Sequence, residues 1–381
     1  MWNRALVQFA VWSLACGAVA LAQEAPLPAG SVNINLPADS PVAVIGMTSD
    51  QSRTSARGAA VILDLHLGLS LRNGSSGRIH GVTLRVVSQE AVMGGKGSVT
   101  ISNVSFGPGE VFPVRIDMQL VRPTQVAGGP LVHVDLDGVL YQDLSFYGPD
   151  RLNSRRNMIA GEMEAQRDRE HFKHLLAQGG KEALQQAMLE SIKRQSDLPA
   201  LSVRVKRGPS VSNAGVTAER PAEFAFVQFP DSPIEPVSGR ALIAGNEARA
   251  PEIEVRNKSS KAVKYVELGW LVSDQSGKQY MAGGLPSSSP NLALTPGQKA
   301  RVVQESTLNF TSNGQPVRVQ NMTGFVSQVE FADGKMWVPN RQNLGNPLLM
   351  RALAPSAEEQ RLTDIYHRKG LNGLIEELKK F

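Results

Sequence analysis

The chain has 381 residues, 41% of them hydrophobic, which is enough apolar material for about two domain cores. Forty Lys and Arg against 35 Asp and Glu leave a net charge of +5, spread without any run of five like charges, so we expect no nucleic-acid partner. Only 20% of residues are charged, and 35 Gly with 23 Pro favour short strands and turns over helical bundles or disorder.

The first 22 residues have the pattern of a secretory signal peptide. Arg4 precedes an uncharged, mostly apolar run, and the small residues that end this run predict cleavage after Ala22. No later stretch approaches the roughly 18 apolar residues of a membrane-spanning helix. The sequence therefore predicts an extracytoplasmic protein, periplasmic or secreted, with no transmembrane segment in the mature chain.

Cys16 is the single cysteine and lies inside this leader. The residues before it, Ser13-Leu14-Ala15, match a lipoprotein cleavage box poorly because its first position is normally Leu, so we do not expect lipid attachment at Cys16. Cleavage after Ala22 leaves a mature chain without cysteine. That chain can form neither a disulfide nor a thiolate metal site.

An internal repeat is the most informative feature of the sequence. Three blocks recur in the same order: LRNGSS at 71–76 as VRNKSS at 255–260, FGPG at 106–109 as LTPG at 294–297, and the segment 134–141 as 329–337 at a separation of about 196. The first two blocks have the composition of turns between apolar strands, and the Asp-Gly at 137–138 is typical of a hairpin. We therefore expect Asn73 and Asn257 to occupy equivalent turns.

Alternating apolar residues predict strands in both copies. In the first copy Val61, Leu63, Leu65, Leu67, Leu69 and Leu71 alternate with polar residues, which predicts a long strand with one face buried. The order of apolar strand, Asn-Ser turn, second strand and Pro-Gly turn resembles the immunoglobulin-like modules of bacterial secreted proteins. This resemblance implies a two-sheet sandwich and leaves function open.

The fold class that follows is mainly β with helical appendages, in two tandem immunoglobulin-like β-sandwich domains that are each followed by a helical segment. The expected boundaries are a signal peptide at 1–22, a first sandwich at 30–148, a helix pair at 149–198, a second sandwich at 199–343 and a C-terminal helix pair at 344–381.

Both helical segments carry apolar residues at helical spacing with a glycine between two halves. Gly179-Gly180 divides the first segment and Gly370 divides the second, while Ser356 with Glu359 forms a capping box at the start of the second. Whether the helix pair belongs to the duplicated unit is left open by the sequence.

Three patterns suggest metal or phosphate chemistry, and each has a plainer interpretation. His171 and His174 have the spacing of two metal ligands, but also that of a charged helix face. The residues 135–138 resemble half of a calcium loop, although a hairpin turn explains them, and the Gly-rich 94–98 is better interpreted as a hairpin tip than as a phosphate loop. We predict no catalytic residue, cofactor or metal site.

The leading functional hypothesis is a non-catalytic extracytoplasmic binding or scaffold protein, with a protein or an envelope polymer as partner. The alternative is an envelope-glycan hydrolase with a carboxylate pair at the domain junction, because two carboxylates suffice for glycoside hydrolysis.

The charge-dense helical stretch offers a candidate contact surface. Its Arg167, Arg169, Glu170 and Lys173 are expected to form an exposed face that orients a partner, while a small apolar stripe docks the helix on the first sandwich or on the next helix. The plainer interpretation is a solvated spacer.

Overall fold

The computed structural model describes residues 24–124, 129–197, 200–207, 219–286, 292–303, 306–341 and 355–381. The expected leader at 1–22, with Cys16, lies outside them. The chain divides into two compact units, the first made of Met1–Arg72, Leu84–Val99 and Val111–Asp135, and the second of Asn73–Thr83, Thr100–Glu110 and Leu136–Phe381.

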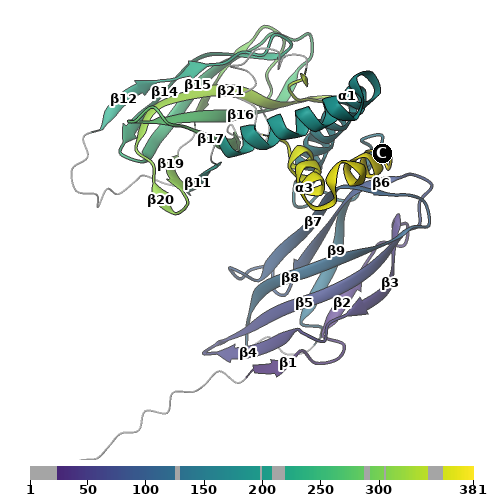
Figure 1. Cartoon of the computed structure of the whole chain (residues 1–381). Helices are drawn as coiled ribbons and strands as arrows, with labels where there is room; N and C mark the ends of the chain where they lie inside the picture. The colour runs from purple at the N-terminus through teal and green to yellow at the C-terminus, as the bar shows by residue number, and fades with distance from the viewer. Residues whose placement is uncertain are drawn as a thin grey trace, which may run out of the picture. The chain divides into compact units, whose positions relative to one another are not determined.

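Strands dominate the described part of the chain (Figure 1). One sheet has the order β1-β4-β5-β3, with β8 paired to β5. Its strands are β1 (Glu24–Pro26), β3 (Val42–Thr48), β4 (Arg53–Arg57), β5 (Ala60–Asn73) and β8 (Val111–Pro123). A second sheet has the order β10-β9-β6-β7, with β2 parallel to β9. It consists of β2 (Val32–Asn35), β6 (Ile79–Val87), β7 (Lys96–Phe106), β9 (Val132–Tyr141) and β10 (Phe146–Tyr147).

A third, twelve-stranded sheet has the order β12-β14-β15-β19-β11-β17-β16-β21-β13, and β18, β20 and β22 pair with β15, β19 and β21. Its strands are β11 (Ala200–Arg207), β12 (Arg220–Glu223), β13 (Ala225–Phe226), β14 (Ile234–Ala244), β15 (Glu247–Asn257), β16 (Val263–Asp274), β17 (Gln279–Pro286), β18 (Lys299–Val303), β19 (Ser306–Ser312), β20 (Gln315–Pro316), β21 (Val319–Phe331) and β22 (Met336–Trp337). One apolar core joins side chains of β15 and β19 to side chains of β16 and β21.

Two helices complete the described residues, α1 (Ser154–Asp197) and α3 (Ala357–Leu378). Each is broken at the glycine that the sequence indicates, because Gly180 and Gly370 have φ of 71° and 67°, a left-handed conformation that glycine adopts at little cost. Among the described residues, neither helix has an apolar stretch long enough to cross a membrane.

The long strand predicted from alternating leucines is confirmed as β5. Leu63 and Leu65 are fully buried and the other inward leucines nearly so, whereas Asp64 and Arg72 on the opposite face are exposed. Period-two alternation therefore places one face of β5 in a core and the other in solvent.

The prediction that Asn73 and Asn257 occupy equivalent turns is confirmed by their hydrogen bonds. Each side-chain amide donates to the carbonyl four residues on, at 2.8 Å in both copies, and to a carbonyl of the Pro-Gly turn, Phe106 at 3.0 Å or Leu294 at 2.9 Å. Each Oδ1 accepts the hydroxyl two residues on at 2.7 Å. Both asparagines are fully buried, so each satisfies backbone groups that water does not reach.

The hairpin predicted at Asp137-Gly138 is wrong. These residues lie inside β9, and Asp137 is buried, where it accepts the backbone N–H groups of Arg151 and Leu152 just before α1. A buried carboxylate that accepts backbone N–H groups is the usual device ahead of a helix. The Gly-rich 94–98 does lie at the connection of β6 to β7, as expected for a hairpin tip.

The real hairpin is four residues further on, and it corrects the third block of the repeat. Tyr141 receives the carbonyl of Ser145 on its N–H, as Phe331 receives that of Lys335. Tyr141 therefore corresponds to Phe331, at a separation of 190 residues instead of the expected 196.

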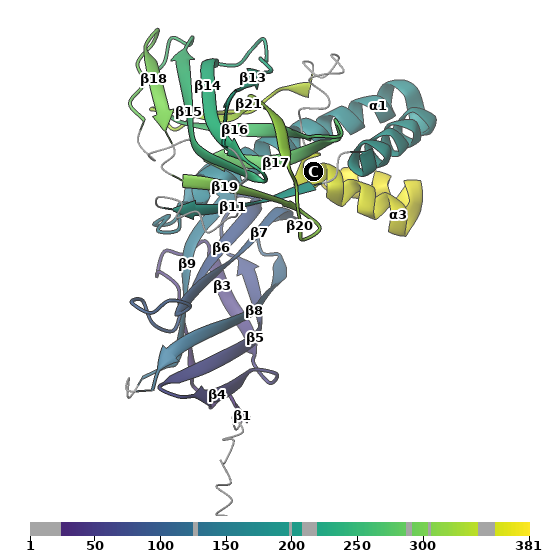
Figure 2. The same ribbon diagram turned by 90° about the vertical axis from the view of Figure 1, so that its left-hand side faces the viewer.

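The two helices follow the same separation. Their shared core consists of Phe172, Leu184 and Met188 of α1 with Leu362, Leu374 and Leu378 of α3, which are matched pairs 190 residues apart. Figures 1 and 2 show α1 and α3 lying side by side. This match supports a duplicated unit that includes the broken helix.

Candidate functional site

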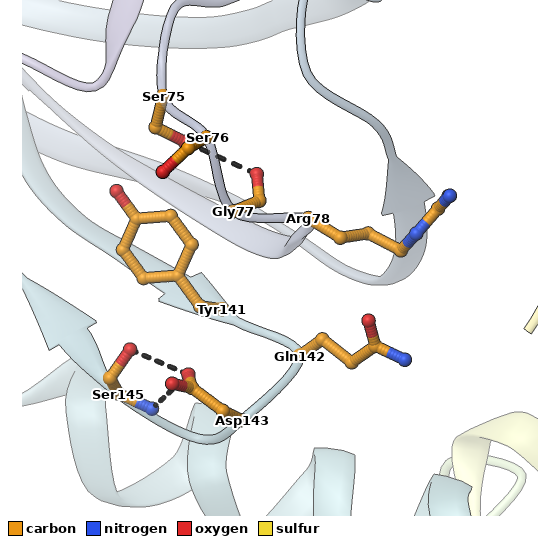
Figure 3. A pocket seen from close by; sticks show the side chains of 8 residues that line it. All are labelled: Ser75, Ser76, Gly77, Arg78, Tyr141, Gln142, Asp143 and Ser145. Atoms are coloured by element: carbon orange, nitrogen blue, oxygen red, sulfur yellow. Dashed lines mark hydrogen bonds between the residues drawn. The ribbon is translucent and has the colours of Figure 1, made fainter.

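A polar cleft of about 560 Å³ lies where the Asn73 turn meets the hairpin between β9 and β10 (Figure 3). This volume falls within the range of small-ligand sites. The cleft is lined by Ser75, Ser76, Gly77, Arg78, Tyr141, Gln142, Asp143 and Ser145. We call it the first-repeat cleft.

Backbone hydrogen bonds fix the two loops against each other. The N–H of Gln142 donates to the carbonyl of Arg78 at 3.0 Å, and the N–H of Leu144 closes the hairpin on the carbonyl of Tyr141 at 3.0 Å. Leu144 has a φ of 67°, which is strained for a branched side chain. A strained non-glycine residue held in a loop marks that loop as a candidate functional segment.

The second repeat builds the same turn and hairpin from different side chains. The N–H of Ala332 donates to the carbonyl of Ala262 at 2.9 Å, and Gly334 takes the left-handed position with a φ of 79°. Lys261 stands at the position of Gly77, and its ammonium pairs with Asp333 at 2.7 Å. The second copy therefore supplies its own cation to the hairpin carboxylate, and the first does not.

Asp143 is the anionic group of the first-repeat cleft. Hydrogen bonds from the Ser145 hydroxyl at 2.6 Å and the Ser145 N–H at 3.0 Å hold the pKa of Asp143 below its usual range. Among the described residues, no Lys or Arg lies within ion-pair distance of this carboxylate. Arg78, the cation of the cleft, donates to the hydroxyl of Ser105 at 3.0 Å.

The helix face that the sequence predicted to be exposed is in large part buried, and the expectation is wrong for Arg169. Its side chain is only 3% exposed, where it pairs with Glu162 and with Glu358 of α3 and lies over the ring of Phe381. Glu162 also receives His80 of β6 at 2.7 Å. The charges are inside because α3 covers this face, which helical periodicity alone does not reveal.

Arg167 is mostly buried as well, with 12% of its side chain exposed. It pairs with the fully buried Asp168, which also receives Arg341 at 2.8 Å and the hydroxyl of Ser356 at 2.6 Å. Burial acts to raise the pKa of Asp168, but Arg167 and Arg341 outweigh it and hold the pKa below its usual range. The remaining residues of the predicted face differ, since Glu170 is exposed and Lys173 is half-buried.

Ser356 caps α3 as predicted, accepting the N–H of Glu359 at 3.0 Å. The side chain of Glu359 does not close the capping box, because it accepts the hydroxyl of Ser191 at 2.5 Å and pairs with Arg194. Of the two candidate metal ligands, His174 is exposed, and burial with nearby Arg341 lowers the pKa of His171 to about 4. Among the described residues, no group of three His, Cys, Asp or Glu is placed to hold a metal.

Glu164 and Glu267 are the two carboxylates that interact between α1 and the third sheet. Burial raises the pKa of Glu164 to about 7, Arg167 opposes this, and Asp168 and Glu267 raise it further. Glu267 accepts the hydroxyl of Tyr265 at 3.0 Å and the amide of Gln328 at 2.5 Å. Neither carboxylate lines the first-repeat cleft.

The raised pKa of Glu164 predicts a pH dependence of stability. The folded chain holds this proton up to about pH 7, whereas the unfolded chain releases it near 4.5, so the free energy of unfolding should fall between those values as pH rises, by about 3 kcal/mol at most. Glu164→Gln should flatten this fall in urea titrations at several pH values, and Glu170→Gln, an exposed control on α1, should not. An unchanged pH profile for Glu164→Gln would contradict the assignment.

Comparisons with known proteins give little. No protein family and no curated protein matches this chain. Among solved structures, red sea bream transglutaminase is 9% identical over 75% of this chain and 31% of its own, with a TM-score of 0.13. A β-glucosidase from Kluyveromyces marxianus is 9% identical over 71% and 45%, with a TM-score of 0.14. This chain spans less than half of either protein, and such scores carry no argument about fold or activity.

Proposed function

We propose that the protein is a non-catalytic extracytoplasmic binding protein, built as two tandem immunoglobulin-like sandwiches with helical segments, and that it holds a partner group in the first-repeat cleft. The partner is a protein or an envelope polymer. The secretory pattern of residues 1–22 supports the location, and the shared turns and hairpins of the two copies support the tandem architecture.

One observation carries the proposal: the two copies share a backbone and differ at the cleft. The second copy has Lys261 paired with Asp333, while the first has Gly77 and Asp143 in those positions. A shared scaffold whose side chains diverge at a polar concavity is what a binding site grafted on a duplicated fold looks like.

The buried charges of the helices support a scaffold role beside binding. Arg155 and Arg156, at the start of α1, pair with the buried Glu330 of β21 at 3.2 and 2.6 Å. Further along, Arg169 bridges Glu162 to Glu358 of α3. Buried ion pairs have strict geometry and high costs of disruption, so they fix α1 in one position against its neighbours.

The competing hypothesis, hydrolysis of envelope glycans, has one supporting observation. The Glu164 carboxyl keeps its proton near neutrality beside a second carboxylate, as a general acid requires. Release of reducing ends from envelope glycan by the parent chain, lost in Glu164→Gln, would favour the hydrolase and would displace the binding proposal.

Gly77→Lys tests the binding proposal directly. The second copy accommodates Lys261 at this position of the same turn, so the variant should fold, with its lysine drawn to Asp143. We expect it to capture the native envelope partner at least tenfold less well than the parent, measured by affinity capture on immobilised mature protein.

Gly74→Lys is the matched control, because Gly74 is an exposed residue of the same turn and corresponds to Lys258 in the second copy. It adds the same charge outside the cleft and should leave capture unchanged. Equal capture by the parent and by folded Gly77→Lys would overturn the proposal.

A further inference from the structure

The second copy indicates what chemistry the first-repeat cleft takes, an inference that rests on the proposed function of that cleft. In the second copy the Lys261 ammonium lies 2.7 Å from Oδ2 of Asp333 and 5.6 Å from the centroid of the Phe331 ring. These are the distances of an ion pair and of a cation–π contact. A carboxylate and an aromatic ring thus hold one alkylammonium group against the hairpin.

The first copy keeps both receiving groups. Asp143 occupies the position of Asp333, and both carboxylates accept the N–H two residues on through Oδ1, at 3.0 and 3.1 Å. Tyr141 occupies the position of Phe331, with the same hairpin hydrogen bonds. A tyrosine ring receives a cation in the same way as a phenylalanine ring.

The cation itself is missing from the first copy, because Gly77 stands where Lys261 does. The Tyr141 ring lies against Gly77, so close that an added Cβ would be 3.0 Å from its Cδ1. Figure 3 shows Arg78 extending away from Tyr141 and Asp143, in the direction set by its bond to Ser105. Asp143 and the ring therefore face the cleft without a cation of their own among the described residues.

We propose that the first-repeat cleft binds a primary ammonium group on an aliphatic stem, namely a lysine side chain of a protein partner. The intramolecular counterpart is itself a lysine, whose methylene stem passes the ring before its ammonium meets the carboxylate. The hydroxyls of Ser75 and Ser76, which line the same cleft, add acceptors for the remaining N–H groups of an ammonium.

The test is a titration of the isotope-labelled full chain with acetyl-Gly-Lys-Gly-amide, followed through the amide resonances of Asp143, Leu144 and Ser145. These resonances should shift progressively, and the same peptide with Nε-acetyl-lysine should bind at least fivefold more weakly. Asp143→Asn should weaken binding by a similar factor, and Gly77→Lys should abolish the shifts. The hairpin at 332–335, where Lys261 already occupies the site, serves as the internal control and should not respond.

Equal shifts with the two peptides, or none with either, would overturn the ammonium assignment. Shifts of the same amides with a neutral N-acetylglucosamine trimer, and none with the lysine peptide, would likewise overturn it. In both cases the cleft would remain the proposed binding site if envelope capture still depends on Gly77. Failure of the proposed function itself is recognised separately, by capture that Gly77→Lys leaves unchanged.

Discussion

Replacing Arg169 by Ala should lower the free energy of unfolding by about 3 to 5 kcal/mol, the usual result of removing one partner from a buried ion pair. The side chains of Glu162 and Glu358 are at most 1% exposed, and each would lose a cationic partner without gaining water. The loss should include the packing of the guanidinium on Phe381, 4.0 Å from the ring centroid. Chemical denaturation followed by circular dichroism measures the change.

Glu170→Ala on the same helix is the control, since that side chain is exposed and its loss should change stability by no more than about 0.5 kcal/mol. An Arg169→Ala variant as stable as Glu170→Ala would contradict the buried network. For the same reason the double reversal of Arg167 and Arg169 to Glu should prevent stable folding, whereas an exposed face would tolerate it.

Asn73→Ala and Asn257→Ala should each cost about 2 to 4 kcal/mol, because each deletion leaves buried backbone groups without partners. In the first copy the affected groups are the carbonyls of Gly77 and Phe106 and the N–H of Ser75. The second copy has the same bonds at the same lengths within 0.1 Å, so the two losses should be alike. Urea denaturation measures both.

Asn35→Ala provides the comparison, since Asn35 makes an exposed bond of 3.3 Å to Asp135 and its removal should have little effect. A large loss for one buried asparagine and none for the other would contradict the equivalence of the two turns. It would also remove the basis for comparing their clefts.

Local patterns were sufficient to predict the strands and the turns. Alternating leucines specify β5 because each buried residue must face one side of a sheet, and the two glycines specify the helix breaks because other residues pay for a left-handed φ. The third block of the repeat failed because Asp137-Gly138 has hairpin composition, yet tertiary structure uses Asp137 to accept N–H groups ahead of α1.

The buried helix face and the cleft could not be predicted from local patterns. Arg169 looks like a surface residue until α3, nearly 190 positions later, supplies Glu358 and covers it. The cleft brings Gly77 next to Tyr141, which are 64 positions apart. The signal that could have found it is the pair Gly77 and Lys261 set against Asp143 and Asp333, which becomes visible only with the hairpins aligned at 190.

The central claim, that the first-repeat cleft is open because it lacks the lysine of the second copy, is tested most directly by a crystal structure of the Gly77→Lys variant. The account predicts an unchanged hairpin and the new ammonium within about 4 Å of the Asp143 carboxylate, over the Tyr141 ring, as Lys261 lies on Asp333 and Phe331. A new lysine directed into solvent, with the cleft still open beside Asp143, would contradict it.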